Sequence, residues 1–532
     1  MKRYLLAAEA DKIQDLLFRS AHLREVVGGS QLLTRFCREV PAKLGIPADN
    51  VLISDGGSFR LLFDTEEQAR AFGDELAEVY RRATGGTLTV AEPVRVNGDF
   101  SAAAEQADEN LRRAKRWREG WQDQPHLLYV AFCASCGIGL AVAHRAYHED
   151  EEPQYLCESC LNKGAERPAG TLGEFLKEFY QEVVGEEESK QADWPGRGKR
   201  RGRREIDPLE DVADYDSRRY VAYLLADGND MGKVFGACRT PQQMHDLSTE
   251  LSQAIRKALA VPTKEIRENN PLDDRPNFIP VLPLILGGDD VFALIPAPWA
   301  LDFARRFCEA YEQELQTLLK EIGLNAPAPT VSAAVVICKS KHPYRLAHEA
   351  GERRLKEAKR VGKRLMLDGE RRCSSVNFEV VLGGRLVVAP PDDSVRPILR
   401  PYWVGENVPQ GWGLPVRALI DHRLAMRSVP NKRLAELRDL YDDLPASLKP
   451  DDLNTWQARL HRLLARIGRN EAHREAVEAA LAELGGGASG WYGVDRYPQD
   501  SWHGHGLPDL LDAWDFALDL EKNRREYEEE AE

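Results

Sequence analysis

The segment Pro283-Leu-Ile-Leu-Gly-Gly-Asp-Asp-Val-Phe-Ala-Leu-Ile295 decides the fold of this chain. Two apolar runs flank a pair of glycines and two adjacent carboxylates, Asp289 and Asp290. The apolar runs predict two buried strands, and Gly287-Gly288 predicts the tight turn of a hairpin between them. Buried Asp is costly unless it is paired or holds a metal, and Mg²⁺ prefers carboxylate and phosphate oxygens. The tip is therefore either an ordinary polar turn or a metal site for phosphoryl or nucleotidyl transfer.

A further candidate carboxylate, Asp227, ends the apolar run Tyr223-Leu-Leu-Ala and is followed by Gly228. The pattern predicts a strand that ends in a turn, with Asp230 as a turn residue or helix cap. An Asp at the end of one strand, beside a hairpin tip that carries carboxylates, is how palm-type nucleotidyltransferases hold two metals. We therefore expect Asp227 and the two tip carboxylates to bind two divalent ions, with the Gly228 carbonyl as a further ligand.

The arrangement occurs twice in the sequence. Three ordered matches carry the repeat: residues 4–8 with 223–227, Gly56-Gly57-Ser58-Phe59 with Gly287-Gly288-Asp289-Asp290, and residues 106–115 with 348–359. In the first copy the metal positions are aligned with Ala8, Ser58 and Phe59, which cannot hold two divalent ions. We therefore predict two palm-like domains, of which only the second carries the metal ligands. Chance similarity between apolar strands is the alternative.

Two CxxC pairs, Cys133-Ala-Ser-Cys136 and Cys157-Glu-Ser-Cys160, are separated by 20 residues. Four thiolates at this spacing predict a tetrahedral structural Zn²⁺ site that is closed to substrate. Two disulfides would be unusual in a cytosolic protein, and a redox CxxC would not need a second pair. The other five of the nine cysteines are expected to be small core residues.

Length and composition bound the remaining interpretation. A chain of 532 residues with 43% apolar residues predicts a multidomain globular protein. It shows no signal peptide and no run of about 18 apolar residues, so we expect a cytoplasmic protein with no membrane partner. The net charge of −14 argues against a surface coated with nucleic acid, although it leaves room for a local basic groove.

These patterns predict an α/β (α+β) protein with two ferredoxin-like palm domains, a zinc-binding insertion and a helical C-terminal domain. The expected ranges are 1–125 for the degenerate first palm, 126–215 for the zinc module with a helical and basic linker, 216–385 for the second palm with its GGDD motif, and 386–532 for the helical domain. Within these, Gly28-Gly29 is either a helix stop or a surface for a nucleotide or protein partner. The basic run 196–204 is either a solvated linker or an RNA contact. His503 and His505 form an HxH pair in a Gly-rich loop, which is weak evidence for metal.

The order of these parts resembles the large subunit of type III CRISPR effector complexes. The residues that carry the resemblance are Ile13-Gln14-Asp15-Leu16-Leu17-Phe18, Gly28-Gly29-Ser30, the four cysteines, Asp227-Gly228 and Gly287-Gly288-Asp289-Asp290. In that family the second palm converts ATP into cyclic oligoadenylate messengers when the complex binds target RNA.

The resemblance implies site residues, cofactors and partners. It implies Asp227, Asp289 and Asp290 as ligands of two Mg²⁺ or Mn²⁺ ions, and Gly228, Gly287, Gly288 and Lys359 as nucleotide contacts, with Lys359 on the triphosphate. It also implies other subunits of such a complex, a guide RNA and a target RNA as partners. Many members begin with an HD nuclease domain. No His-Asp pair occurs in the first hundred residues here, so we expect no DNA cleavage. Asn229-Asp230 stands where the family often has Asp-Asn.

Other functions stay open at this point. A diguanylate cyclase also uses a GGD-type palm, but the zinc module, the repeat and the helical tail argue against it. A catalytically silent scaffold subunit and a stand-alone cyclic nucleotide synthase are the remaining alternatives. Adenine as the base rests on the resemblance alone, and ring size cannot be predicted from these residues.

Overall fold

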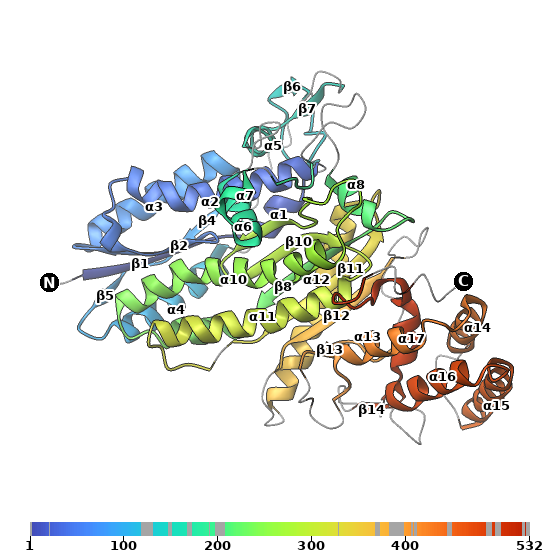
Figure 1. Ribbon diagram of the computed structural model, residues 1–532. Helices are drawn as coiled ribbons and strands as arrows, with labels where there is room; N and C mark the ends of the chain where they lie inside the picture. Colours follow the sequence, from blue (N-terminus) through green and yellow to red (C-terminus); the bar gives the residue numbers. More distant parts are fainter. Residues whose placement is uncertain are drawn as a thin grey trace.

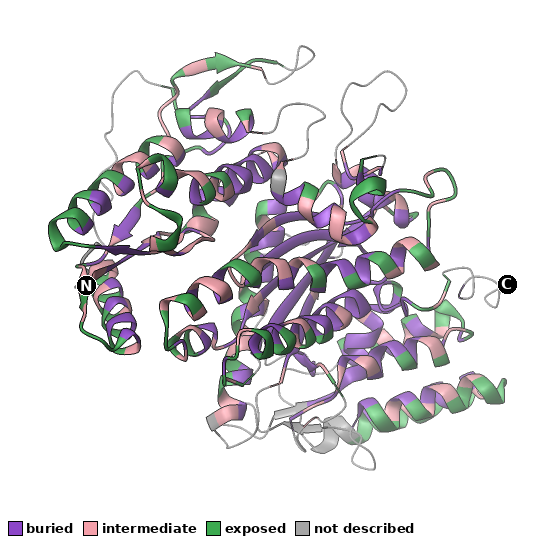
Figure 2. Cartoon of the chain, turned by 60° about the vertical axis from the view of Figure 1, so that its left-hand side comes forward, coloured by how far each residue is buried: buried purple, intermediate pink, exposed green. Residues whose placement is uncertain are grey.

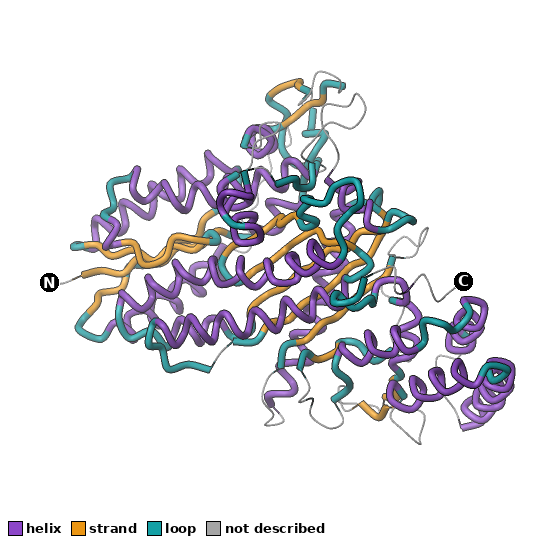
Figure 3. Tube along the Cα trace, in the orientation of Figure 1, coloured by secondary structure: helices purple, strands orange, loops and turns teal. Residues whose placement is uncertain are grey.

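The protein is described by a computed structural model. The described residues are 3–20, 22–118, 131–146, 152–166, 173–190, 192–196, 208–327, 329–367, 373–381, 398–405, 408, 412–443, 450–485, 492–494, 502–523 and 527. Two sheets with helices on their faces form the larger part of the molecule, and a group of C-terminal helices lies beside the second sheet (Figure 1, Figure 3).

The first sheet has the strand order β2-β3-β1-β4, and β5 continues the β4 edge along β1. Its elements are β1 (Arg3–Ala10), α1 (Ile13–Phe18), α2 (Leu23–Lys43), β2 (Val51–Asp55), β3 (Ser58–Phe63), α3 (Glu66–Thr84), β4 (Leu88–Val90), β5 (Val94–Val96) and α4 (Phe100–Arg118). Apolar residues alternate along β1. Leu6 and Ala8 pack with the cluster that holds Tyr80 of α3, whereas Leu5 and Ala7 pack with the cluster that holds Phe100 of α4. Helices therefore cover both faces of the first sheet.

The second sheet has the order β13-β12-β11-β8-β10-β9. Its elements are β8 (Tyr220–Gly228), α9 (Met231–Gly236), α10 (Pro241–Asn269), β9 (Leu282–Gly287), β10 (Asp290–Pro296), α11 (Ala300–Glu321), β11 (Val331–Lys339), α12 (Tyr344–Leu367), β12 (Ser375–Val380) and β13 (Tyr402–Trp403). Counted along the chain within each domain, both sheets share the order fourth-first-third-second strand, which is the ferredoxin-like palm order. The predicted repeat of two palm sheets is thereby confirmed.

The two faces of the second sheet are covered by different helices. A Cβ added to Gly228 would lie 2.4 Å from the hydroxyl oxygen of Tyr311 in α11. Asp227, the preceding residue, forms an ion pair with Lys359 of α12. Because side chains alternate along a strand, α11 and its neighbour α10 cover one face of β8 and α12 covers the other. Figure 2 shows the strands as a buried layer between helices with exposed outer surfaces.

The two palms meet at their hairpin tips. A Cβ added to Gly56 would lie 2.9 Å from the main-chain nitrogen of Gly288, so the two tips touch through their backbones. Helix α10 of the second palm packs on β2, and α2 of the first palm packs on β9. On the other side, the ring of Phe18 stacks on His348 of α12 with ring centroids 3.8 Å apart. The sequence repeat is therefore also an approximate symmetry of the packing.

The insertion between the palms contains β6 (Ala143–Arg145), β7 (Gln154–Leu156), α5 (Glu158–Ala165), α6 (Glu174–Val184), α7 (Glu186–Ser189) and α8 (Pro208–Val212). Gly28 and Gly29 lie inside α2, where a Cβ on Gly28 would be 1.9 Å from the carbonyl oxygen of Lys163. They are therefore neither a helix stop nor an exposed surface, because they allow α5 to pack closely on α2. Residues 197–204 of the basic run lie outside the described residues.

The C-terminal part contains α13 (Val416–Ala425), α14 (Asn431–Asp442), α15 (Pro450–Ile467), α16 (Glu471–Leu484), β14 (Tyr492–Val494), β15 (Trp502–Gly504) and α17 (Gly506–Asp512). Helices α13 to α16 follow one another between residues 416 and 484, as expected for the helical domain. β13 lies beyond residue 385 and yet extends the second palm sheet by pairing with β12. The position of the predicted domain boundaries stays a prediction. No helix in the described part of the chain has the length and apolar character of a membrane span.

Candidate active site and metal centre

The candidate active site lies at the tip of the β9–β10 hairpin. Asp290, the first residue of β10, faces Gly287 of β9 on one side and Asp227 of β8 on the other. The turn residues are Gly288 and Asp289, one position later than the Gly287-Gly288 turn that the sequence predicts. Gly288 has φ +59°, a left-handed conformation in which glycine carries no steric cost. The fold thus brings Asp227 and Asp290 side by side, with Asp289 on the turn.

Gly228 allows the tip to lie close to the end of β8. Its N–H donates to the carbonyl oxygen of Asp289 over 3.3 Å, and a Cβ here would be 3.0 Å from the Asp289 Cβ. Asp230 follows as the residue before α9, with φ +62°, and forms an ion pair with Lys233. It therefore stands at the N-cap position of α9, as expected, although its side chain makes no capping hydrogen bond there. The side chain of Asn229 is buried instead, where its amide donates to Thr330 Oγ1 over 3.0 Å.

The three carboxylates repel one another in a half-buried setting. Burial, and then the charge of Asp227, raise the pKa of Asp289 to about 6. Burial and the charges of Asp227 and Asp289 raise the pKa of Asp290 well above its ordinary value. The Lys359 ammonium opposes both shifts and pairs with Asp227. A metal cation is therefore favoured at this tip. The Lys359 ammonium supplies a positive charge here by pairing with Asp227.

The first palm keeps a carboxylate that the sequence alignment missed. Glu9 lies on the β1 face that is covered by α4, and Lys115 of α4 pairs with it at 2.8 Å. Asp227 and Lys359 of α12 have the same relation in the second palm. Ala8 points to the opposite face and is therefore not the counterpart of Asp227, as the alignment proposed.

Aligned on the hairpin tips, the counterparts in the first palm are Glu9 for Asp227, Gly57 for Asp289 and Ser58 for Asp290. Two of the three carboxylates are still absent, so the first copy remains degenerate. Glu9 is close enough to the second tip for its charge to raise the pKa of Asp289. The aligned lysines at 115 and 359 are the sequence signal that could have found this pair.

The four cysteines form the candidate metal centre. Among the described residues they are the group of metal-ligand side chains whose ligand atoms all lie within 4.8 Å of one another. The Sγ atoms of Cys136 and Cys157 are 3.8 Å apart, as expected for a tetrahedral zinc with Zn–S bonds of about 2.3 Å. All four are buried and none forms a disulfide. The donor set therefore fits a structural Zn²⁺.

The metal centre is attached to the first palm through buried polar contacts. Ser20 Oγ lies 3.8 Å from Cys160 Sγ, and the Lys163 ammonium donates to the Leu16 carbonyl and to Ser20 Oγ. Lys163 is only 1% exposed. Cys160 thus lies directly against the segment between α1 and α2.

The HxH pair gives no metal centre in the described residues. His505 is fully buried at the start of α17, where its Nδ1 accepts from the Leu507 N–H over 3.0 Å and its Nε2 lies 3.2 Å from the Tyr441 hydroxyl. Its role is to cap the helix. The side chain of His503 lies outside the described residues.

The second palm matches the model of a known protein family. Residues 220–367 match the family model "Cas10/Cmr2, second palm domain". No curated protein matches the chain in sequence. Its structure is similar to a crystal structure of a Csm1-Csm4 cassette in complex with cA4, with a TM-score of 0.54 and 16% identity over 97% of this chain and 70% of that chain. It is also similar to Csm1 of T.onnurineus, with a TM-score of 0.53 and 16% identity over 98% of this chain and 70% of that chain.

At this identity the structural likeness concerns the fold, and it extends over almost the whole chain. The family model covers the strand that ends in Asp227, the hairpin tip and the helix that carries Lys359. The resemblance to the palm-containing large subunits is thereby confirmed. Residues 220–367 of this chain are similar to the second palm domain of the Cas10/Cmr2 family.

Proposed function

We propose that this chain is a nucleotidyltransferase that makes cyclic oligoadenylates from ATP. It acts in the cytoplasm as the large subunit of an RNA-guided type III CRISPR antiviral complex. The observation that carries the proposal is the meeting of Asp227, Asp289 and Asp290 at one hairpin tip of a Cas10/Cmr2 palm. The similar Csm1-Csm4 cassette is described as a complex with cA4, which supports this product class.

The acidic tip suits a pair of Mg²⁺ or Mn²⁺ ions, because burial and the neighbouring carboxylate charges raise the pKa of Asp289 and Asp290. Asp227, Asp289 and Asp290 would hold the ions. When bound, they would lower the pKa of an attacking 3′-hydroxyl and balance the charge of departing pyrophosphate. Lys359 leaves Asp227 and binds the triphosphate of the nucleotide, since an ammonium satisfies phosphate as well as carboxylate. Gly287 and Gly288 keep the tip free of side chains that would obstruct the nucleotide.

The first palm supplies the position of a second nucleotide. Its Glu9–Lys115 pair repeats the Asp227–Lys359 pair, and Glu9 is electrostatically close to Asp289. Lys115 therefore binds the phosphates of one ATP molecule. The 3′-hydroxyl of that ATP is then presented to the second ATP, which is held at the acidic tip. This division explains why the first palm has kept the lysine and one carboxylate after losing the other metal positions.

Partners follow from the same family relation. We propose a Csm4-like subunit, a guide RNA and a target RNA, because the similar solved chains include a Csm1-Csm4 cassette. The zinc module would serve as a structural part of this subunit. Guide and target RNA would control when the palms are active.

The test is nucleotide turnover by the assembled complex. The complex is incubated with each labelled NTP and Mg²⁺ or Mn²⁺, with and without cognate target RNA. Among the four NTPs, we expect only ATP to give pyrophosphate and cyclic products. We expect Asp289→Ala or Asp290→Ala to abolish both. Asp230→Ala is the matched control, because this neighbouring carboxylate precedes α9 and pairs with Lys233. Absence of any oligonucleotide with target RNA present would exclude the enzyme and favour a scaffold subunit. Full activity of both tip variants would instead show that these carboxylates are not its catalytic residues.

A further inference from the structure

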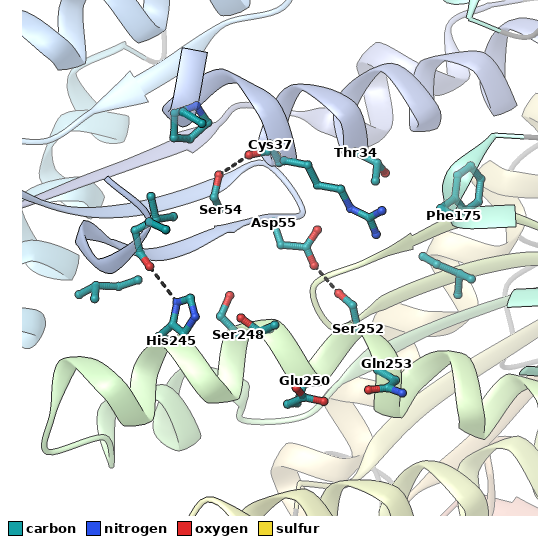
Figure 4. Close-up of a pocket in the computed structure, with 18 of the residues that line it drawn as sticks. Thr34, Cys37, Ser54, Asp55, Phe175, His245, Ser248, Glu250, Ser252 and Gln253 are labelled. Atoms are coloured by element: carbon teal, nitrogen blue, oxygen red, sulfur yellow. Dashed lines mark hydrogen bonds between the residues drawn. The ribbon is translucent and has the colours of Figure 1, made fainter. Parts of the chain in front are cut away.

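A cavity of about 550 Å³ lies between the two palms on the side away from the carboxylates. Its walls come from α2 and β2 of the first palm, from α10 of the second palm, and from Phe175 of α6 (Figure 4). Leu286 and Asp55 also line it, and each directly precedes a glycine of the touching hairpin tips. Helix α10 covers the face of the second sheet opposite to α12, whereas Asp227 points toward α12. The cavity is therefore separate from the acidic tip, although both adjoin the same pair of turns.

The interior is held in shape by contacts that cross from one palm to the other. Ser252 of α10 donates to the Asp55 carboxylate, and His245 Nδ1 donates to the carbonyl oxygen of Val51 over 2.8 Å. Figure 4 shows the two helices facing each other across the opening, with these side chains between them. The lining combines hydroxyl groups such as Ser248 with apolar surface such as Leu52. Size and lining are those of a small-molecule pocket, in which apolar walls surround a few fixed polar groups.

Two arginines from equivalent helices line this cavity and share one carboxylate. Arg38 of α2 binds Glu178 of α6 through two parallel bonds of 2.8 and 2.9 Å. Arg256 of α10 reaches the same carboxylate at 3.2 Å. The Nε of Arg256 is buried and has no hydrogen-bond partner among the described residues. Two guanidinium groups around one carboxylate leave an excess positive charge beside Glu178, and the carboxylates of Asp55 and Glu250 line the same cavity.

We propose that this cavity is a second ligand site, which takes a phosphate monoester of nucleotide size and places its phosphate between Arg38 and Arg256. A phosphate offers the same paired oxygen geometry as the Glu178 carboxylate, with more charge and one more oxygen for the unsatisfied Nε. The phosphate therefore displaces Glu178, and the apolar wall takes the rest of the molecule. Because the two arginines belong to different palms, an occupied site ties the palms together from the side opposite to the acidic tip.

Calorimetric titration of the full chain, without added divalent metal, tests the proposal. The probes are AMP, adenosine and inorganic phosphate. We expect AMP to bind more tightly than either fragment, and the double substitution Arg38→Gln with Arg256→Gln to weaken AMP by at least about tenfold, since each guanidinium contributes a charge-assisted bond. Glu178→Gln removes the competing carboxylate and should tighten AMP binding severalfold.

Two controls keep the result specific. Arg81→Gln removes a positive charge from the exposed Arg81–Glu78 pair of α3, which does not line the cavity, and should leave AMP binding unchanged. Asp290→Ala should also leave it unchanged, whereas loss of binding would place AMP at the acidic tip. Thermal unfolding shows whether each variant is folded. Equal binding of adenosine, equal binding of phosphate alone, or AMP binding unaffected by the double substitution would each overturn the proposal. None of these outcomes depends on ATP turnover.

Discussion

At the scale of single residues, the paired lysines at 115 and 359 carry the most information. Each reaches from a helix to the carboxylate at the end of the central strand of its own palm. Burial and neighbouring charges raise the pKa of Asp289 and Asp290, so a cation beside these carboxylates is stabilised. Lys359 supplies such a cation by pairing with Asp227, and in the proposed function it moves from Asp227 to a nucleotide.

Replacing Lys359 with Met should lower kcat/KM for ATP by about 30- to 100-fold, because a charge-assisted bond to a phosphate contributes about 2–3 kcal/mol. The measurement is steady-state ATP turnover by the assembled complex at fixed Mg²⁺. Lys115→Met is the matched variant, since it removes the same group from the palm without the tip carboxylates. We expect it to raise the KM for the accepting nucleotide more than it lowers kcat. Wild-type turnover by Lys359→Met would show that this lysine only balances the charge of Asp227.

At the scale of elements, α12 joins several parts of the molecule. It covers one face of the second sheet, brings Lys359 to the tip, and places His348 between Phe18 of α1 and Phe292 of β10. Burial lowers the pKa of His348 to about 4. The ring is therefore neutral in the folded protein and holds the two palms together as an aromatic surface.

This histidine should make the fold sensitive to acid. An unfolded histidine takes up its proton near pH 6.5, whereas the folded one does so near pH 4. The contribution of the neutral His348 to the free energy of unfolding is therefore fully present above pH 6.5 and is lost as the pH falls toward 4. Between these pH values the free energy of unfolding falls by about 1.4 kcal/mol per pH unit, so that about 2 kcal/mol is lost at pH 5. Urea unfolding at pH 7 and pH 5 should show a smaller loss of stability for His348→Phe, which keeps the stacked ring. An equal loss in both proteins would contradict this, and His461→Phe at an exposed site is the control.

At the scale of the whole molecule, the zinc module sits against the first palm and reaches toward the second. Lys163 and Ser20 connect the cysteines to α1, and α1 in turn contacts α12 through Phe18. Glycines 28 and 29 let α5 approach α2 without intervening side chains. The metal centre thus supports α1, the helix through which the first palm contacts α12 of the second.

Removing the metal should loosen this packing. The chain should contain about one Zn²⁺ by elemental analysis, and Cys160→Ser should lose it and lower the free energy of unfolding by at least about 2 kcal/mol. Hydrogen exchange should become faster at residues 16–20, which contact the module directly. Cys373→Ser changes a cysteine outside the cluster and is the control. Unchanged zinc content in Cys160→Ser would remove this cysteine from the site.

Much of this architecture could be predicted from the sequence, because apolar periodicity, turn glycines and cysteine spacing are local signals. The hairpin, the repeated palm order and the four-cysteine cluster all follow from such patterns. Glu9 could not be found this way, because its role depends on which face of β1 it occupies, and a one-residue shift in alignment reverses the face. The role of Gly28 and Gly29 depends on a helix more than 100 residues away. The cavity and its shared carboxylate need three elements that are distant in the sequence.

The contact between the two hairpin tips has a consequence for how such a protein can diverge. Gly56 and Gly288 meet main chain to main chain, and Gly56 has φ +56°, so neither steric room nor backbone conformation admits a larger residue at position 56. The distance between the two palms at this point is therefore set by the contact of two backbones. Substitution of side chains cannot change it. Lineages that need a different spacing would have to lengthen or shorten a hairpin. Insertions and deletions at these turns, more than point changes around them, should then separate relatives whose two palms lie at different distances.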